Sequence, residues 1–177
     1  SSELKVKTIA NIPMSFHTNN SEVFRLAGPG GAISTGGETS PDVGVGSICL
    51  NQGSDDSAIM TFKSSDIAHG QTTGFGETDT FFRIRKESAA NGGAFVQGIS
   101  EDGNIEGLKL SGYFAGTGDN TGKSTSQSGP LVLQAMKSDD SADSADIGSN
   151  GNMVTINNRN TCRFIFDAEG DFHADSS

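Results

Sequence analysis

Carboxylates at alternate positions make the segment Asp167-Ala168-Glu169-Gly170-Asp171 a candidate cation site. Oxygens at positions 1, 3 and 5 around a glycine turn are typical of the start of a calcium loop, where they converge on the ion. A complete loop also has Gly at position 6, but this sequence has Phe172 there. Asp167, Glu169 and Asp171 are therefore candidate calcium ligands, and a β-turn with solvated acidic side chains is the other interpretation.

A second acidic stretch, Ser138–Asp146, reads SDDSADSAD and contains four aspartates and no basic residue. Such a run is most simply a solvated loop that its own charge keeps away from neighbouring surfaces. A divalent-cation site is the alternative, because carboxylate oxygens are the ligands that calcium prefers.

The candidate bases are three histidines, of which His69 lies closest to a nucleophile. Ser64, Asp66 and His69 are sequence neighbours, so the residue types of a hydrolytic triad are present. Real triads join distant segments and place the nucleophile on a strained turn such as G-x-S-x-G, which is absent from this sequence. We therefore predict no catalytic residues and no enzyme activity, with the Ser and Asp side chains capping backbone groups of a turn.

The other two histidines, His17 and His173, suggest a site shared between chains. If three chains met on an axis, each residue would form a ring of three imidazoles able to bind a metal. The simpler interpretation is that each histidine lies on a strand, exposed or hydrogen-bonded.

Sugar-binding sites stack the ligand on exposed aromatic rings and hold its hydroxyls with carboxylates and amides. The sequence has no Trp and a single Tyr, so the supply of such rings is small. Phe75, which lies between two glycines, Phe95 and Tyr113 are the candidate glycan contacts. The alternative for the two phenylalanines is that they pack in the core.

Charge and hydropathy exclude several classes of protein. The 12 basic and 22 acidic residues give a net charge of −10, without the clustered Lys and Arg that nucleic-acid binding requires. No segment reaches the roughly 18 apolar residues of a membrane-spanning helix. Cys49 and Cys162 are too few for a disulfide framework, so one bridge or two free thiols remain open.

Short β-strands are the elements that must position these residues. Gly supplies 24 of the 177 residues, and small polar residues interrupt almost every window long enough for a helix. The dipeptides Asn91-Gly92 and Asp102-Gly103 predict hairpins. The fold class is all-β, with tight Gly and Asn turns, as a sandwich or as an intertwined trimeric β-prism or β-helix. Apolar runs between turn signals predict strands at 5–12, 48–51, 59–63, 81–86, 94–99, 108–114, 131–136, 153–157 and 162–167.

An internal repeat relates residues 20–32 to residues 160–172 at a constant shift of 140. Each copy predicts a strand, a tight turn and a second strand, with two apolar side chains on one face. Such a unit has too narrow an apolar edge to fold alone, so copies from other chains would bury it. The matching positions are Asn20 and Asn160, Phe24 and Phe164, Leu26 and Phe166, and Gly30 and Gly170.

The stretch Ser15–Pro41 resembles the short repeats of bacteriophage tail-fibre proteins. The matching residues are Phe24-Arg25-Leu26, Gly30 and the end Thr39-Ser40-Pro41, whereas Gly28-Pro29-Gly30-Gly31 is richer in turn residues than the usual repeat. Cys49–Gly70 and Arg163–Asp175 resemble an uncharacterised module of marine phage and prophage virion proteins. The resemblance implies a homotrimeric, β-rich virion appendage or attachment protein.

The sequence thus predicts a fibre-like segment at residues 1–45 and a β-rich module at 46–177, whose second repeat unit spans 160–174. The expected function is that of a non-enzymatic phage tail-fibre component, located in the virion or outside the cell. Its expected partners are copies of itself, other virion proteins and a host-surface glycan, without nucleic acid or membrane insertion. Calcium is the one cofactor considered. The alternatives are a monomeric lectin-like β-sandwich and a self-assembling extracellular filament or surface-layer subunit.

Overall fold

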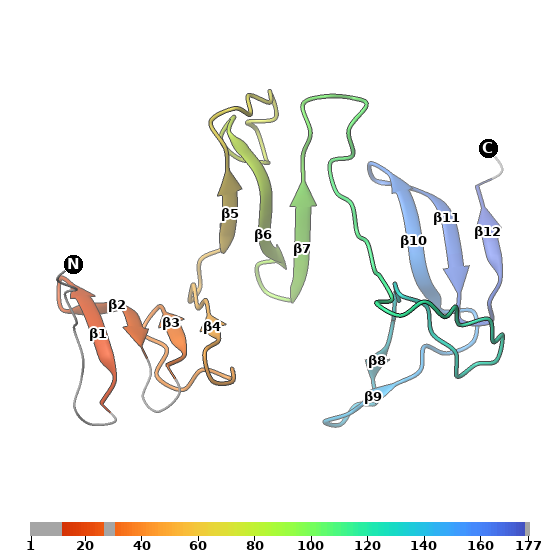
Figure 1. Ribbon diagram of the computed structural model, residues 1–177, viewed down its shortest axis with the longest axis horizontal. Helices are drawn as coiled ribbons and strands as arrows, with labels where there is room; N and C mark the ends of the chain where they lie inside the picture. Colours follow the sequence, from red (N-terminus) through yellow and green to blue (C-terminus); the bar gives the residue numbers. More distant parts are fainter. Residues whose placement is uncertain (1–11, 27–30, 176–177) are drawn as a thin grey trace. The chain divides into compact units, whose positions relative to one another are not determined.

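The computed structural model of the chain describes residues 12–26 and 31–175, and their regular elements are all β-strands (Figure 1). The strands form four small open sheets, so the all-β prediction is confirmed. Within the described residues, no helix is long and apolar enough to cross a membrane. The chain divides into two compact units, Ser1–Lys109 and Leu110–Ser177. The predicted division after residue 45 stays a prediction, and the predicted strand 5–12 lies outside the described residues except for Ile12.

The first sheet of the N-terminal unit has the order β1-β2-β3-β4. β1, β2 and β3 are antiparallel neighbours, and β4 runs parallel to β3. Thr35 at the end of β3 accepts a hydrogen bond from the Asn51 backbone amide at its hydroxyl, which fixes the chain beyond β4. The strands are β1 (Met14–Thr18), β2 (Ser21–Leu26), β3 (Ile33–Thr35) and β4 (Ile48–Cys49).

The second sheet of this unit is the antiparallel sheet β5-β6-β7. The predicted Asn91-Gly92 hairpin is confirmed, since β6 pairs with β7 directly after this turn, and Gly92 and Gly93 at the start of β7 have φ angles of 74° and 80°. Glycine is suited to these positions because it adopts positive φ without a steric penalty. The Asp102-Gly103 prediction is wrong, because the chain after β7 forms turns and no strand pair there. The strands are β5 (Met60–Lys63), β6 (Thr80–Ser88) and β7 (Gly92–Gly98).

The C-terminal unit contains a two-stranded sheet and the antiparallel sheet β10-β11-β12. The short hairpin is β8 (Lys137–Ser138) with β9 (Ser144–Ala145). The larger sheet is β10 (Asn152–Asn158), β11 (Thr161–Asp167) and β12 (Phe172–Ala174).

The predicted repeat corresponds to the same strand pairing in both units. Phe16 pairs with Phe24 in the β1–β2 hairpin, and Ile156 pairs with Phe164 in the β10–β11 hairpin, at the same shift of 140. Both hairpins have a register irregularity at the next residue of their first strand. The two sequences therefore fold into equivalent hairpins although few of their residues are identical.

The third strands of the two repeats differ by one residue. Leu26 pairs with Ile33 in the first repeat, whereas Phe166 pairs with Phe172 in the second, so the second connection is one residue shorter. Gly170 in that connection has a φ angle of 90°, as expected for a turn glycine. Its predicted counterpart, Gly30, lies outside the described residues.

Two predicted strands, at 108–114 and 131–136, are absent from the structure. Both runs are irregular chain in the long connection between β7 and β8 (Figure 1). Their sequences have strand character, but a strand exists only when its backbone groups have a partner strand, and neither run has one within the described residues. These two predictions are therefore wrong for the isolated chain.

The described residues bury very little apolar material. Ala32 is the hydrophobic residue among them that is buried, and the other buried positions are polar. A self-sufficient domain of this size would bury about 70% of the surface of its unfolded chain. The sheets therefore leave apolar side chains in contact with solvent.

Candidate functional site

The acidic turn between β11 and β12 is organised around Asp167, whose residue surface is only 4% exposed. Its Oδ1 accepts hydrogen bonds from the backbone amides of Glu169 and Asp171, at 3.1 and 2.9 Å. Its Oδ2 lies 2.9 Å from Nε2 of His173. The hydrogen bond from His173, followed by the one from the Asp171 amide, lowers the pKa of Asp167 below its ordinary value. The carboxylate is thus held charged at the base of the turn.

Two of the three predicted calcium ligands converge at this turn. One ligand atom from each of Asp167, Asp171 and His173 lies within 4.8 Å of the others, whereas the Glu169 carboxylate is outside this group. His173 was predicted only as a member of a histidine ring between chains. His173 of β12 pairs with Ile165 of β11, so their side chains lie on the same face of the sheet. Asp167 follows Ile165 by two residues and points to this face as well, which brings its carboxylate next to His173. No signal in the sequence fixes the register of so short a strand.

Removing divalent ions tests this calcium prediction. The Asp167 oxygens already accept hydrogen bonds from two amides and a histidine, so the turn is satisfied without an ion. We therefore expect the same thermal unfolding midpoint with 1 mM calcium and with excess chelator, within about 1 °C. Asp171→Asn is the matched variant, since it removes a ligand charge and keeps the shape. A chelator-dependent fall in the midpoint that this variant abolishes would instead establish a structural calcium ion.

The Ser138–Asp146 stretch forms the β8–β9 hairpin and its turn. Oδ1 of Asp139 accepts hydrogen bonds from the backbone amide and hydroxyl of Ser141, at 2.9 and 2.7 Å, and from the amide of Asp143. The Ser141 hydroxyl lowers the pKa of Asp139. Among the described residues, these aspartates do not converge as a group that could hold a metal. The stretch is an exposed turn closed by one of its own carboxylates.

The histidine next to Ser64 and Asp66 is a buried structural residue. His69 is 2% exposed, and its Nε2 lies 2.6 Å from the backbone carbonyl of Thr80. Its Nδ1 accepts a hydrogen bond from the backbone amide of Gln71 at 3.2 Å. Both ring nitrogens are therefore engaged by backbone groups, while the Ser64 hydroxyl bonds to Asp66. The three side chains do not form a relay, and the prediction of no enzyme activity stays a prediction.

The remaining histidine, His17, lies on β1 and is exposed. Its Nε2 is 2.9 Å from the Ser15 hydroxyl, two residues away on the same strand. The proposed rings of His17 or of His173 depend on neighbouring chains, so they stay predictions.

Two of the three predicted glycan-contact rings are covered by arginines of β6. The Arg83 guanidinium lies 4.9 Å from the centre of the Phe75 ring and donates to the backbone carbonyls of Gly74 and Phe75. The Arg85 guanidinium lies 4.3 Å from the centre of the Phe95 ring. Both rings are half-buried, whereas Tyr113 is 88% exposed. Of the three predicted residues, Tyr113 is the one whose ring is free to stack on a sugar.

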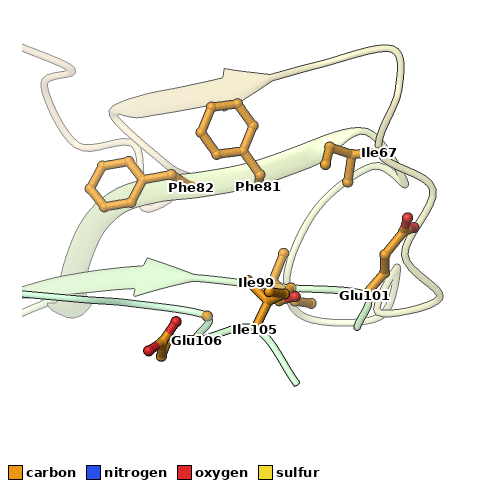
Figure 2. A pocket seen from close by; sticks show the side chains of 9 residues that line it. Ile67, Phe81, Phe82, Ile99, Glu101, Ile105 and Glu106 are labelled. Atoms are coloured by element: carbon orange, nitrogen blue, oxygen red, sulfur yellow. The ribbon is translucent and has the colours of Figure 1, made fainter. Parts of the chain in front are cut away.

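An apolar hollow of about 350 Å³ lies beside the first residues of β6 (Figure 2). Phe81 and Phe82 of β6 line it, together with Ile99 and Ile105 from the chain that follows β7. Glu101 also lines the hollow, and its carboxylate accepts a hydrogen bond from the backbone amide of Ala68 at 2.9 Å. The walls carry no nucleophile and base in contact, so the hollow is suited to receiving an apolar group. Sequence reasoning did not find it, because its walls come from separate segments.

The sheet β10-β11-β12 has one apolar face that solvent reaches. Phe172 packs between its β11 neighbours, with ring centres 5.5 Å from Phe164 and 5.1 Å from Phe166. Each of these rings is nevertheless exposed to solvent. We call this surface the phenylalanine face. Its residues are Val154, Ile156, Phe164, Phe166 and Phe172.

The two sheets of the N-terminal unit have apolar faces of the same kind. Strand pairing places Met14, Phe16, Phe24 and Leu26 together on β1 and β2, where the Phe16 and Phe24 rings are 5.5 Å apart. In the sheet β5-β6-β7, Phe62 of β5 packs edge-on against Phe82 of β6, with ring centres 5.3 Å apart. The apolar face of that sheet consists of Met60, Phe62, Phe82, Ile84 and Val96.

Cys49 and Cys162 are free and half-buried in this structure, on β4 and β11 respectively. Apolar faces occur on three of the four sheets that the described residues form. Comparison of the chain with family models, curated proteins and solved structures finds no match.

Proposed function

We propose that this chain is a non-enzymatic structural subunit that associates with copies of itself to build a β-rich appendage. The phage tail-fibre resemblance of Ser15–Pro41 favours a trimeric virion fibre located outside the cell. In that setting the chain would also contact other virion proteins and, through Tyr113, a host-surface glycan. These assignments rest on the resemblance, whereas self-association is supported by the surface of the molecule.

The observation that carries the proposal is the exposure of apolar side chains on the individual sheets. Ile156 and Phe172 on the sheet β10-β11-β12 are 51% and 55% exposed, and Phe16 on β1 is 51% exposed. Among the described residues, Ala32 is the buried hydrophobic residue. At about 25 cal/mol per Å² of apolar surface, covering such faces is a strong driving force for association.

Identical copies are the partners that fit this surface best. Apolar faces occur on sheets distributed from β1 to β12, so a partner must match the chain along most of its length. Copies around a symmetry axis meet this requirement, because every copy presents the same set of faces to its neighbours. Association in this way would also protect the open sheet edges, which otherwise invite uncontrolled pairing.

Mass measurement by light scattering tests self-association directly. We expect the purified chain to have about three times the monomer mass of 18.3 kDa, because three copies can enclose their apolar faces around one axis. A monomer would contradict the proposal and show that the faces are covered within one chain, as in the lectin-like alternative. Open-ended polymers in negative stain would favour the filament or surface-layer alternative over a closed trimer.

A further inference from the structure

We propose that the segments Leu108–Phe114 and Leu131–Met136 are β-strands whose backbone partners come from a second copy of this chain. The inference rests on the proposed self-association and names the part of the chain that carries it. Two independent properties of the segments support it: their sequence pattern and the state of their backbone.

The sequences of both segments are those of strands. Residues 108–114 read LKLSGYF, in which Leu108 and Leu110 alternate with polar residues as on a strand with one buried face. Residues 131–136 begin with Leu131, Val132 and Leu133, a continuous apolar run typical of a strand buried on both faces. Such residues are unusual in a connection that remains in water.

The backbone of both segments is unpaired within the described residues. No backbone hydrogen bond joins either segment to another described part of the chain. Their apolar side chains are also unusually exposed, with Leu110 at 62% and Leu133 at 66%. A segment with free amides, free carbonyls and exposed leucines can add to a sheet, because pairing satisfies the backbone while the side chains are buried.

The two segments are already held next to one another. A Cβ atom on Gly112 would lie 1.9 Å from the backbone carbonyl oxygen of Pro130, so these two parts of the backbone are closer together than any residue except glycine allows. Pro130, which has no amide hydrogen, cannot donate at this crossing. The crossing brings the strand-like runs together without forming a ladder between them.

A second copy is the partner that the charges favour. The whole chain has a net charge of −10, which opposes association through most of its surface. The two segments contain one charged residue, Lys109, so copies can approach here without repulsion between carboxylates. Apolar faces on three separate sheets also offer more surface than a short peptide covers, whereas a second copy brings the same faces itself.

Hydrogen exchange on the assembled protein tests the inference. In the oligomer, we expect backbone amides at 108–114 and 131–136 to exchange about a hundredfold more slowly than in an unstructured chain. The loop at 116–129 serves as the internal reference. Apart from Gly122 and Gln127, whose amides donate hydrogen bonds within the loop, its amides should exchange at the unstructured rate.

Proline substitution tests whether the pairing is between chains. Ser111→Pro and Gln134→Pro each remove one backbone amide donor and leave the apolar side chains in place. We expect the pair of substitutions to weaken association at least tenfold and to abolish protection of both segments. Thr125→Pro is the matched control, because Thr125 follows Ser124 in a turn closed by the Gln127 amide, where proline is compatible.

The outcomes separate this inference from the proposed function. An oligomer in which both segments exchange as fast as the 116–129 loop would overturn the inference and leave self-association standing. An oligomer that keeps its mass and its protection in the double proline variant would also overturn it. A monomeric wild-type protein would overturn both.

Discussion

Replacing Ile156 by aspartate should dissociate the oligomer while leaving the isolated chain folded. Ile156 lies on β10 within the phenylalanine face and is 51% exposed, so the fold of one chain depends little on it. In an assembly that covers this face, the substitution removes an apolar contact and places a charge where water is excluded. We expect a loss of about 3 kcal/mol or more per copy, which is more than a hundredfold in the association constant.

The adjacent residue supplies the control for this substitution. Thr155 precedes Ile156 on β10 and points to the opposite face of the same sheet, because side chains alternate along a strand. Thr155→Asp adds the same charge at the same level of the sheet, and we expect it to leave the mass by light scattering unchanged. If Ile156→Asp also kept the mass of the wild-type oligomer, the phenylalanine face would not be the association surface.

The location of a strand and the choice of its apolar face were the features that the sequence predicted best. Apolar runs bounded by turn residues located β4, β5, β6, β7, β10 and β11, because the period-two pattern depends only on which face is apolar. The 140-residue shift identified two hairpins whose register agrees at the Phe16–Phe24 and Ile156–Phe164 pairs. The repeat could be found from few identities because matching apolar positions and turn residues specify the same pairing.

The errors arose where structure depends on a partner rather than on local pattern. The runs at 108–114 and 131–136 have strand sequences, but no described strand lies beside them. A ladder is a property of two segments, and a sequence pattern describes only one. The same limitation explains His173, which completes the Asp167 turn through the register of a three-residue strand. Neither the missing partners nor this register could be predicted from local residue types.

His69→Ala should cause the largest loss of stability among single substitutions in the β5-β6-β7 region. The imidazole is buried and bonds to the Thr80 carbonyl and the Gln71 amide, and its ring lies edge-on to Phe75 at 5.4 Å. Alanine leaves a cavity and two backbone groups without partners. We expect the free energy of unfolding to fall by about 3 kcal/mol, measured by urea denaturation at a fixed protein concentration.

The matched control is the same substitution at an exposed histidine. His17 is exposed, bonds to the Ser15 hydroxyl and lies across from Glu22, and water replaces these polar contacts at little cost. His17→Ala should therefore change the unfolding free energy by less than about 0.5 kcal/mol. If the two variants lost equal stability, His69 would not be a buried structural residue. A large loss at His69 alone is the result expected when a buried imidazole bonds both to Gln71 after β5 and to Thr80 at the start of β6, because no water can replace it there.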